Sequence, residues 1–152
     1  MLSERTLNFK GEKCSGGKEA KQRISILLAA NMNGTQKLPP LFIGKYFKPI
    51  CFKNVNKLPA AYHANRNPWM TGHIYEKWLR DLDRRFLSEK RKVPLIVDNC
   101  SVHVEVSDLK AIRVEFLPPK VILQPMDQGV INSFKRIYRK VLLQRVIMGL
   151  EL

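Results

Sequence analysis

In Val93-Pro94-Leu95-Ile96-Val97-Asp98-Asn99, five apolar residues are stopped abruptly by two polar ones. A short apolar run of this kind is typical of a β-strand that is buried on both faces. Residues 112–117 alternate apolar and polar and predict a second strand, which Pro118-Pro119 ends. Residues 104–111, between the two, are predicted to form a short helix. Because crossovers between parallel strands are right-handed, the two strands are expected to be neighbours in one sheet.

A helix is predicted before the first of these strands. Thr71 can cap its start, and the run Lys90-Arg91-Lys92 places cations at its negative end. Between them apolar side chains recur at steps of three and four residues, which predicts one buried stripe. Its members are Ile74, Trp78, Leu79, Leu82 and Phe86. We interpret Trp78 as a core anchor rather than as a platform on which a base stacks.

The remaining segments complete an α/β order. Residues 23–30 and 38–43 predict a hairpin around a turn at 31–35. Residues 45–68 are interpreted as a long basic loop and residues 1–22 as a loose basic arm. Asp127 is expected to open a last helix, whose apolar residues share one face: Ile131, Phe134, Tyr138, Val141, Leu142 and Val146. These elements predict a mixed sheet flanked by helices.

Charge is the most informative property of the composition. The 152 residues suit one domain, and 27 Lys and Arg face 13 Asp and Glu, which gives a net charge of +14. There is no acidic residue between Glu19 and Glu76. Such a surface attracts polyanions, so nucleic acid is the expected partner. An anionic membrane surface is the lesser option, and a basic protein without such a partner is the alternative. No apolar run approaches the roughly 20 residues of a membrane helix, and no signal-peptide core opens the chain.

The cysteines indicate neither a disulfide framework nor a zinc site. Cys14, Cys51 and Cys100 are odd in number and far apart, and no CxxC pair exists. The three histidines fall at no zinc-ligand spacing. We expect reduced thiols in an intracellular protein.

Two carboxylates lie where the pattern makes them candidate metal ligands. Asp98 follows the apolar strand, at the carboxyl end where α/β sheets collect ligands, and Asp127 begins the last helix. If these ends converge, two hard oxygen ligands meet inside a basic surface and suit Mg²⁺ on a phosphodiester. The alternative is that Asp98 caps a turn and Asp127 caps a helix.

Six short strings occur in order along the chain: Arg23-Ile24-Ser25-Ile26-Leu27-Leu28-Ala29-Ala30-Asn31, Leu41-Phe42-Ile43-Gly44-Lys45, Pro68-Trp69-Met70-Thr71, Asp98-Asn99-Cys100-Ser101-Val102-His103, Phe116-Leu117-Pro118-Pro119 and Gln124-Pro125-Met126-Asp127-Gln128-Gly129. With these strings the chain closely resembles the DDE superfamily endonuclease domain of Tigger/pogo-type transposases and their domesticated jerky-like and centromere protein B-like relatives. The resemblance covers nearly the whole chain, from about Arg5 onward.

The resemblance implies a ribonuclease H-like fold in which three acidic residues bind two Mg²⁺ or Mn²⁺ ions. Asp98 matches the second acidic residue and Asp127 the third, so both are the implied catalytic and metal-binding residues. Around them Asn99, His103 and Gln128 would position ligands or phosphate. His103 as a purely structural histidine is the alternative. The resemblance also implies a nuclear location.

The chain departs from the family pattern in two ways. The first carboxylate of the family lies in an Asn-x-Asp-Glu motif on the first strand, and this motif precedes the segment that residues 1–152 match. Residues 120–123 also look about two residues short. We therefore expect an N-terminally truncated domain that lacks its central first strand, and that forms a homo-oligomer or borrows a strand from a partner. Two carboxylates hold a metal pair poorly, so metal binding should be weak or absent.

The resulting functional hypothesis is a transposase-derived DNA-binding domain without cleavage activity. Its phosphate contacts are expected from Lys21, Lys45, Lys48, Lys53, Lys57, Lys135, Arg136, Arg139 and Lys140. The alternative is a Mg²⁺-dependent endonuclease or strand transferase that uses Asp98 and Asp127 with a first carboxylate upstream. A third reading is a pseudogene-derived polypeptide without a stable fold.

Overall fold

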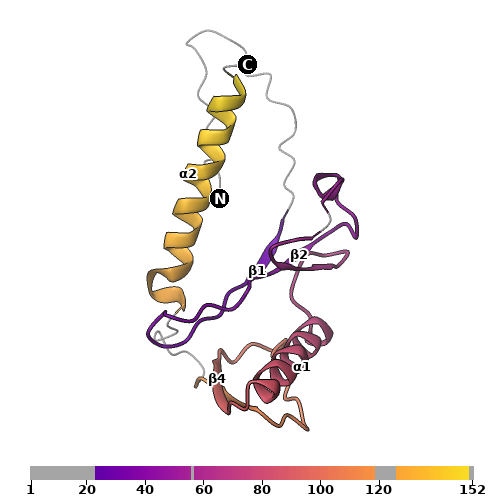
Figure 1. The fold of residues 1–152 in the computed structure, drawn as a ribbon, viewed down its shortest axis with the longest axis vertical. Coiled ribbons are helices and arrows are strands. Elements are labelled where there is room, and N and C mark those ends of the chain that lie inside the picture. The colour runs from indigo at the N-terminus through magenta and orange to yellow at the C-terminus, as the bar shows by residue number, and fades with distance from the viewer. Residues whose placement is uncertain (1–22, 56, 119–125, 151–152) are drawn as a thin grey trace.

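The computed structural model of the chain describes residues 23–55, 57–118 and 126–150 (Figure 1). Nine elements follow one another along these segments: β1 (Ser25–Leu27), β2 (Leu41–Gly44), the 3-10 turn η1 (Ile50–Phe52), β3 (Ala61–Ala64), α1 (Gly72–Ser88), β4 (Val93–Val97), β5 (Ile112–Phe116), the π-helical turn η2 (Met126–Val130) and α2 (Ile131–Leu150). The predicted α/β class is confirmed. The predicted arm at 1–22 lies outside the described residues.

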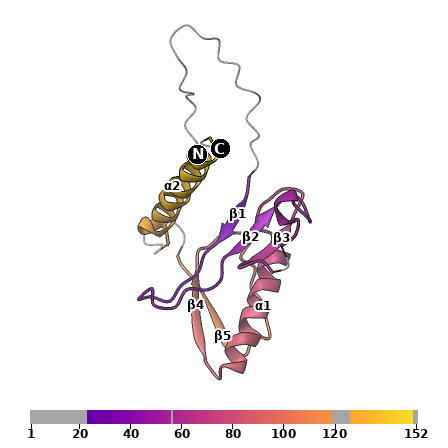
Figure 2. The ribbon, with the colours of Figure 1, turned by 45° about the horizontal axis from the view of Figure 1, so that its top comes forward.

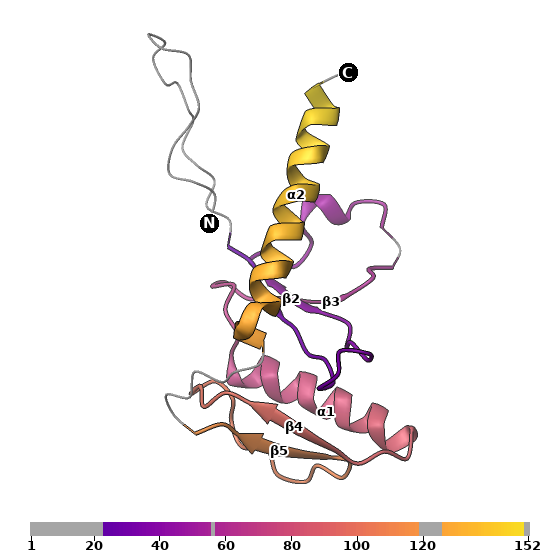
Figure 3. The ribbon, with the colours of Figure 1, turned by 90° about the vertical axis from the view of Figure 1, so that its left-hand side faces the viewer.

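The strands form two sheets in the described part of the chain, where one mixed sheet was expected. In the first, β1 pairs antiparallel with β2 as the predicted hairpin, with Ile26 opposite Phe42. β3 lies parallel on the other side of β2. In the second sheet β4 and β5 pair in parallel, which confirms that these strands are neighbours. Figure 3 shows β4 on the side of the first sheet and β5 farther away.

Helix α1 packs against both sheets. The Thr71 hydroxyl oxygen accepts a hydrogen bond from the N–H of Ile74 at 3.4 Å, so the predicted cap is confirmed. One buried cluster joins the helix to β5 and contains Tyr75, Leu79, Leu82, Phe86, Ala111 and Ile112. A second cluster joins Ile74 to Leu41 and Ile43 of β2. Trp78 packs against both clusters, which confirms it as a core anchor.

A buried carboxylate ties α1 to the start of β5. Asp83 Oδ1 accepts hydrogen bonds from the N–H groups of Ala111 and Ile112, both at 2.8 Å, and from Lys110 at 3.1 Å. Burial alone would raise the pKa of Asp83, but these hydrogen bonds outweigh it and hold the pKa below its ordinary value. The ionised carboxylate is therefore part of the native packing.

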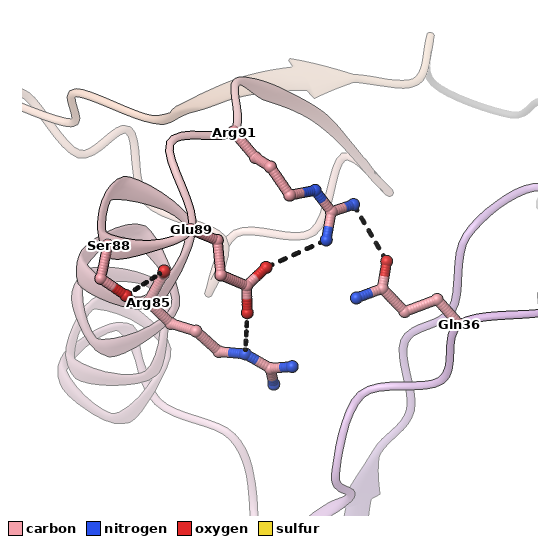
Figure 4. A network of polar contacts seen from close by, with 5 residues as sticks. All are labelled: Gln36, Arg85, Ser88, Glu89 and Arg91. Carbon is pink, nitrogen blue, oxygen red and sulfur yellow. Dashed lines mark hydrogen bonds and ion pairs between the residues drawn. The ribbon is translucent and has the colours of Figure 1, made fainter.

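The end of α1 is fixed by a polar network that reaches the first hairpin (Figure 4). Lys90 takes a positive φ of 53°, and the N–H of Arg91 donates to the carbonyl of Phe86 at 2.9 Å, which closes the last turn. The Glu89 carboxylate bonds Arg85 at 2.9 Å and Arg91 at 3.0 Å. Arg91 also donates to Gln36 of the β1–β2 turn at 2.9 Å. The network thereby links the beginning of β4 to the first sheet.

Three predictions about secondary structure are wrong. Residues 45–68 are not all loop, because η1 lies within them and β2 supplies the parallel pairing that makes β3 a strand. Residues 104–111 form no helix: Asp108 takes a positive φ of 69°, and the N–H groups of residues 110–112 bond to Asp83. β4 is not buried on both faces, since Ile96 is 60% exposed. Helix α1 covers one face of this sheet, so burial along β4 alternates.

Helix α2 presents much of its apolar surface to solvent (Figure 2). Ile137, Tyr138, Val141, Leu142, Leu143, Val146, Ile147 and Met148 are all exposed. The predicted apolar face exists on the helix, yet it does not cover a sheet in the described structure. None of the described helices is long and apolar enough to cross a membrane.

The Asp83 hydrogen bonds make stability depend on pH. A carboxyl group whose folded-state pKa is lowered stabilises the fold above its unfolded pKa, and the contribution is lost as pH falls through the folded pKa. We expect the free energy of unfolding to drop from about pH 5 to about pH 3. Asp83→Asn should lower it by about 2 kcal/mol at neutral pH, because the charge that strengthens three hydrogen bonds is lost. Urea unfolding across this pH range measures both effects.

The matched control is Asp81→Asn, one turn position away on the exposed side of α1, where the carboxylate pairs with Arg84. It should cost less than about 0.5 kcal/mol. An Asp83→Asn variant as stable as the wild type, or with the same loss at low pH, would contradict this role.

Candidate functional site

Asp98 lies directly after β4, as predicted, and its carboxylate is 41% exposed. Its Oδ1 is 2.7 Å from Nδ1 of His103, and the same nitrogen is 3.1 Å from the Asp98 carbonyl oxygen. The N–H of His103 donates to the carbonyl of Cys100 at 2.9 Å. A carbonyl oxygen only accepts, so Nδ1 carries the hydrogen. The loop thus folds back on itself and fixes one oxygen of Asp98.

Tyr75 of α1 completes this cluster, and the sequence analysis did not single it out. Its side chain is fully buried, and its ring centroid is 4.6 Å from that of His103, with 35° between the planes. Burial, and after it the charge of Asp98, raises the pKa of Tyr75, so the hydroxyl keeps its proton at neutral pH. The available signal was its position beside Ile74 on the apolar stripe, and that signal indicates only burial.

Asp127 is placed differently from the prediction. It lies exposed in η2, and α2 itself begins at Ile131. Gln128 and Gly129 interrupt the helical conformation, with φ of +106° at Gly129, so Asp127 does not open a continuous helix. Asn99 and Gln128 are exposed as well.

Convergence of Asp98 and Asp127 stays a prediction. Residues 119–125, which join β5 to η2 and include the segment that looks short, lie outside the described structure. Among the described residues no group of three His, Cys, Asp or Glu side chains could hold a metal ion. Asp98, with one oxygen taken by His103, fits a single weakly held cation better than a metal pair.

The predicted phosphate contacts fall on two regions. Lys45, Lys48, Lys53 and Lys57 are exposed in the connection between β2 and β3, which we call the basic loop. No ion pair involves these lysines in the part of the chain that the structure describes. Tyr46 and Phe47 are exposed between the first two, 52% and 79% respectively, and the Lys45 ammonium lies 5.6 Å from the Tyr46 ring centroid. The basic loop therefore presents cations together with aromatic faces.

The second basic region is α2. Lys135, Arg136, Arg139 and Lys140 are all exposed along the helix, and three of them line a surface hollow with Asn132 and Gln144. Lys21, the remaining predicted contact, lies outside the described residues.

Comparison with known proteins gives one consistent family. A family model described as DDE superfamily endonuclease matches residues 21–152. The chain is 45% identical over 153 residues to Tigger transposable element-derived protein 4 of Mus musculus, an alignment that covers 99% of this chain and 30% of that protein. It is 35% identical to Major centromere autoantigen B of Homo sapiens, over 88% of this chain and 22% of that protein. It is also 35% identical to the human Jerky protein homolog, over 80% of this chain and 24% of that protein.

The chain thus spans less than a third of the length of these relatives. No solved structure matches it.

Proposed function

The chain belongs to the DDE superfamily endonuclease family, and from this premise we propose that it is a transposase-derived domain that binds DNA without cleaving it. The observation that carries the proposal is the basic loop, whose four lysines are exposed and not ion-paired within the described residues. Lysines of this kind exchange condensed counterions for phosphate contacts, which gives affinity without reading the bases.

The absence of cleavage is proposed from the carboxylates. Asp98 and Asp127 are the two acids that match the family motifs, and no described group of three could hold a metal. In two-metal chemistry one ion activates the attacking oxygen and the other stabilises the leaving oxygen. A chain that holds at most one ion loosely supplies neither function well.

The second candidate function is a Mg²⁺-dependent endonuclease or strand transferase. It is favoured by Asp98, which lies at the carboxyl end of a parallel strand with one oxygen oriented by His103. In this reading Asp98 and Asp127 act as catalytic metal ligands with a first carboxylate from a longer polypeptide. Asn99, His103 and Gln128 then position the ligands or the phosphate.

We further propose a ribonuclease H-like domain that takes up one more strand. In the described structure β1 pairs only with β2 and β4 pairs only with β5, while one helix covers both sheets. Unpaired edges of this kind accept an extended segment through backbone hydrogen bonds. The donor is a second copy of the chain or another polypeptide. Because one relative is named for the centromere, a chromosomal structure, we propose a nuclear location.

Affinity for DNA should fall steeply with salt, and the basic loop should account for part of that slope. Replacing Lys45, Lys48, Lys53 and Lys57 by Ala should make the slope of log K against log[salt] shallower by roughly 0.9 for each lost phosphate contact on duplex DNA. Fluorescence anisotropy with duplexes of unrelated sequence measures the slope and should give similar values for all of them.

Lys92→Ala, an exposed lysine beyond the end of α1, is the matched control and should leave the slope unchanged. Salt-independent binding, or no binding at low salt, would overturn the proposal.

For the second candidate, the informative change is Asp98→Asn in a polypeptide extended to include the first strand. The amide removes the charge that a divalent ion needs, so Mn²⁺ binding should be abolished in isothermal titration calorimetry. Asn99→Ala should retain most of it. Equal Mn²⁺ affinity in the Asp98→Asn protein would refute the metal assignment.

The strand proposal predicts self-association of the 152-residue chain. Sedimentation velocity over a hundredfold range of concentration should show dimers or larger species at the upper end. A backbone peptide that pairs with an edge should suppress them. A monomer at every concentration that also binds no strand peptide would contradict the proposal.

A further inference from the structure

The Tyr75 hydroxyl is a buried polar group for which the described residues provide no hydrogen-bond partner. Buried hydroxyls in proteins are almost always bonded, so an exception requires an explanation. Tyr62 offers the contrast within the same chain, because its hydroxyl donates to the carbonyl of Tyr46 at 2.6 Å. The missing acceptor for Tyr75 is therefore to be sought in something that binds the protein.

The surroundings of Tyr75 identify the place. The N–H of Tyr75 bonds the carbonyl of Thr71 at 2.9 Å in the first turn of α1. Its ring lies 4.6 Å from His103 on one side and 6.1 Å from Trp78 on another, measured between centroids. A ring held by two aromatic neighbours has a defined orientation. His103 is in turn bonded to Asp98, so the tyrosine is built into the wall of the Asp98 site.

Asp98 has an oxygen to spare at the same place. His103 engages Oδ1, and Oδ2 has no protein partner among the described residues. A divalent cation such as Mg²⁺ typically binds through one or two carboxylates and keeps several of its waters. Those waters need acceptors and donors from the surrounding protein.

We propose that the Tyr75 hydroxyl belongs to the Asp98 site and donates a hydrogen bond to an oxygen of the ligand held there, a water molecule of a hydrated divalent cation. This role rests on the proposed assignment of Asp98 as a cation ligand. It adds a residue that neither the acidic motifs nor the basic surface indicated. It also explains why a fully buried hydroxyl is left unbonded by the protein itself.

The test is Tyr75→Phe, which removes only the hydroxyl and keeps the ring against His103. Mn²⁺ is the probe, titrated to millimolar concentration while paramagnetic broadening of the His103 and Asn99 amide signals is followed by NMR. We expect Tyr75→Phe to weaken Mn²⁺ binding at least fivefold, to leave the His103 ring nitrogen shifts unchanged without metal, and to keep or raise the melting temperature. Tyr62→Phe, which removes a bonded hydroxyl, should lower the melting temperature and leave Mn²⁺ binding unaltered.

Each other outcome is decisive. If Tyr75→Phe lowers the melting temperature and binds Mn²⁺ as the wild type does, the hydroxyl is structural and the proposal fails, while the assignment of Asp98 stands. If the wild type shows no broadening that Asp98→Asn removes, the cation assignment and the role of Tyr75 fail together. DNA binding through the basic loop is unaffected by that result, because it is measured separately.

Discussion

The hydrogen bonds from the backbone of residues 110–112 to Asp83 are the constraint on which the arrangement of the second half of the chain depends. They hold the start of β5 against α1 and fix the point at which the irregular segment before it ends. With β5 in place, β4 pairs beside it in parallel register, Leu95 opposite Val114. The carboxyl end of β4, and with it Asp98, is then positioned relative to the first turn of α1.

The candidate site is built outward from that end of the sheet. The loop after β4 returns to α1, where Tyr75 packs on His103 and His103 orients Asp98. Close packing extends to the helix start: a methyl group on Gly72 would lie 3.1 Å from Val104. The loop therefore has little room to move relative to α1. Such support is what a ligand site requires, because a ligating oxygen must be held in one orientation.

Elements with strong local signals could be predicted from the sequence. The cap at Thr71, the stripe of α1 and the two strands at 93–97 and 112–116 each follow from a few adjacent residues. β3 could not be predicted, because Ala61–Ala64 becomes a strand only through its pairing with β2. The irregular path of residues 104–111 depends on Asp83, which is 27 residues or more away in the sequence. At the site, motifs indicated Asp98, Asp127 and His103, whereas Tyr75 was hidden among core residues and emerges only from contacts.

The basic loop and α2 carry cations on two separate parts of one polypeptide. A polyanion that contacts one region is held near the other, so the second contact forms within a complex that already exists. Its effective concentration is then set by the geometry of the chain rather than by the bulk solution, and the avidity of the pair exceeds what either region achieves alone. A short oligonucleotide that reaches only one region forgoes this gain. Length of the nucleic acid, more than its sequence, thereby becomes the property that such a surface discriminates.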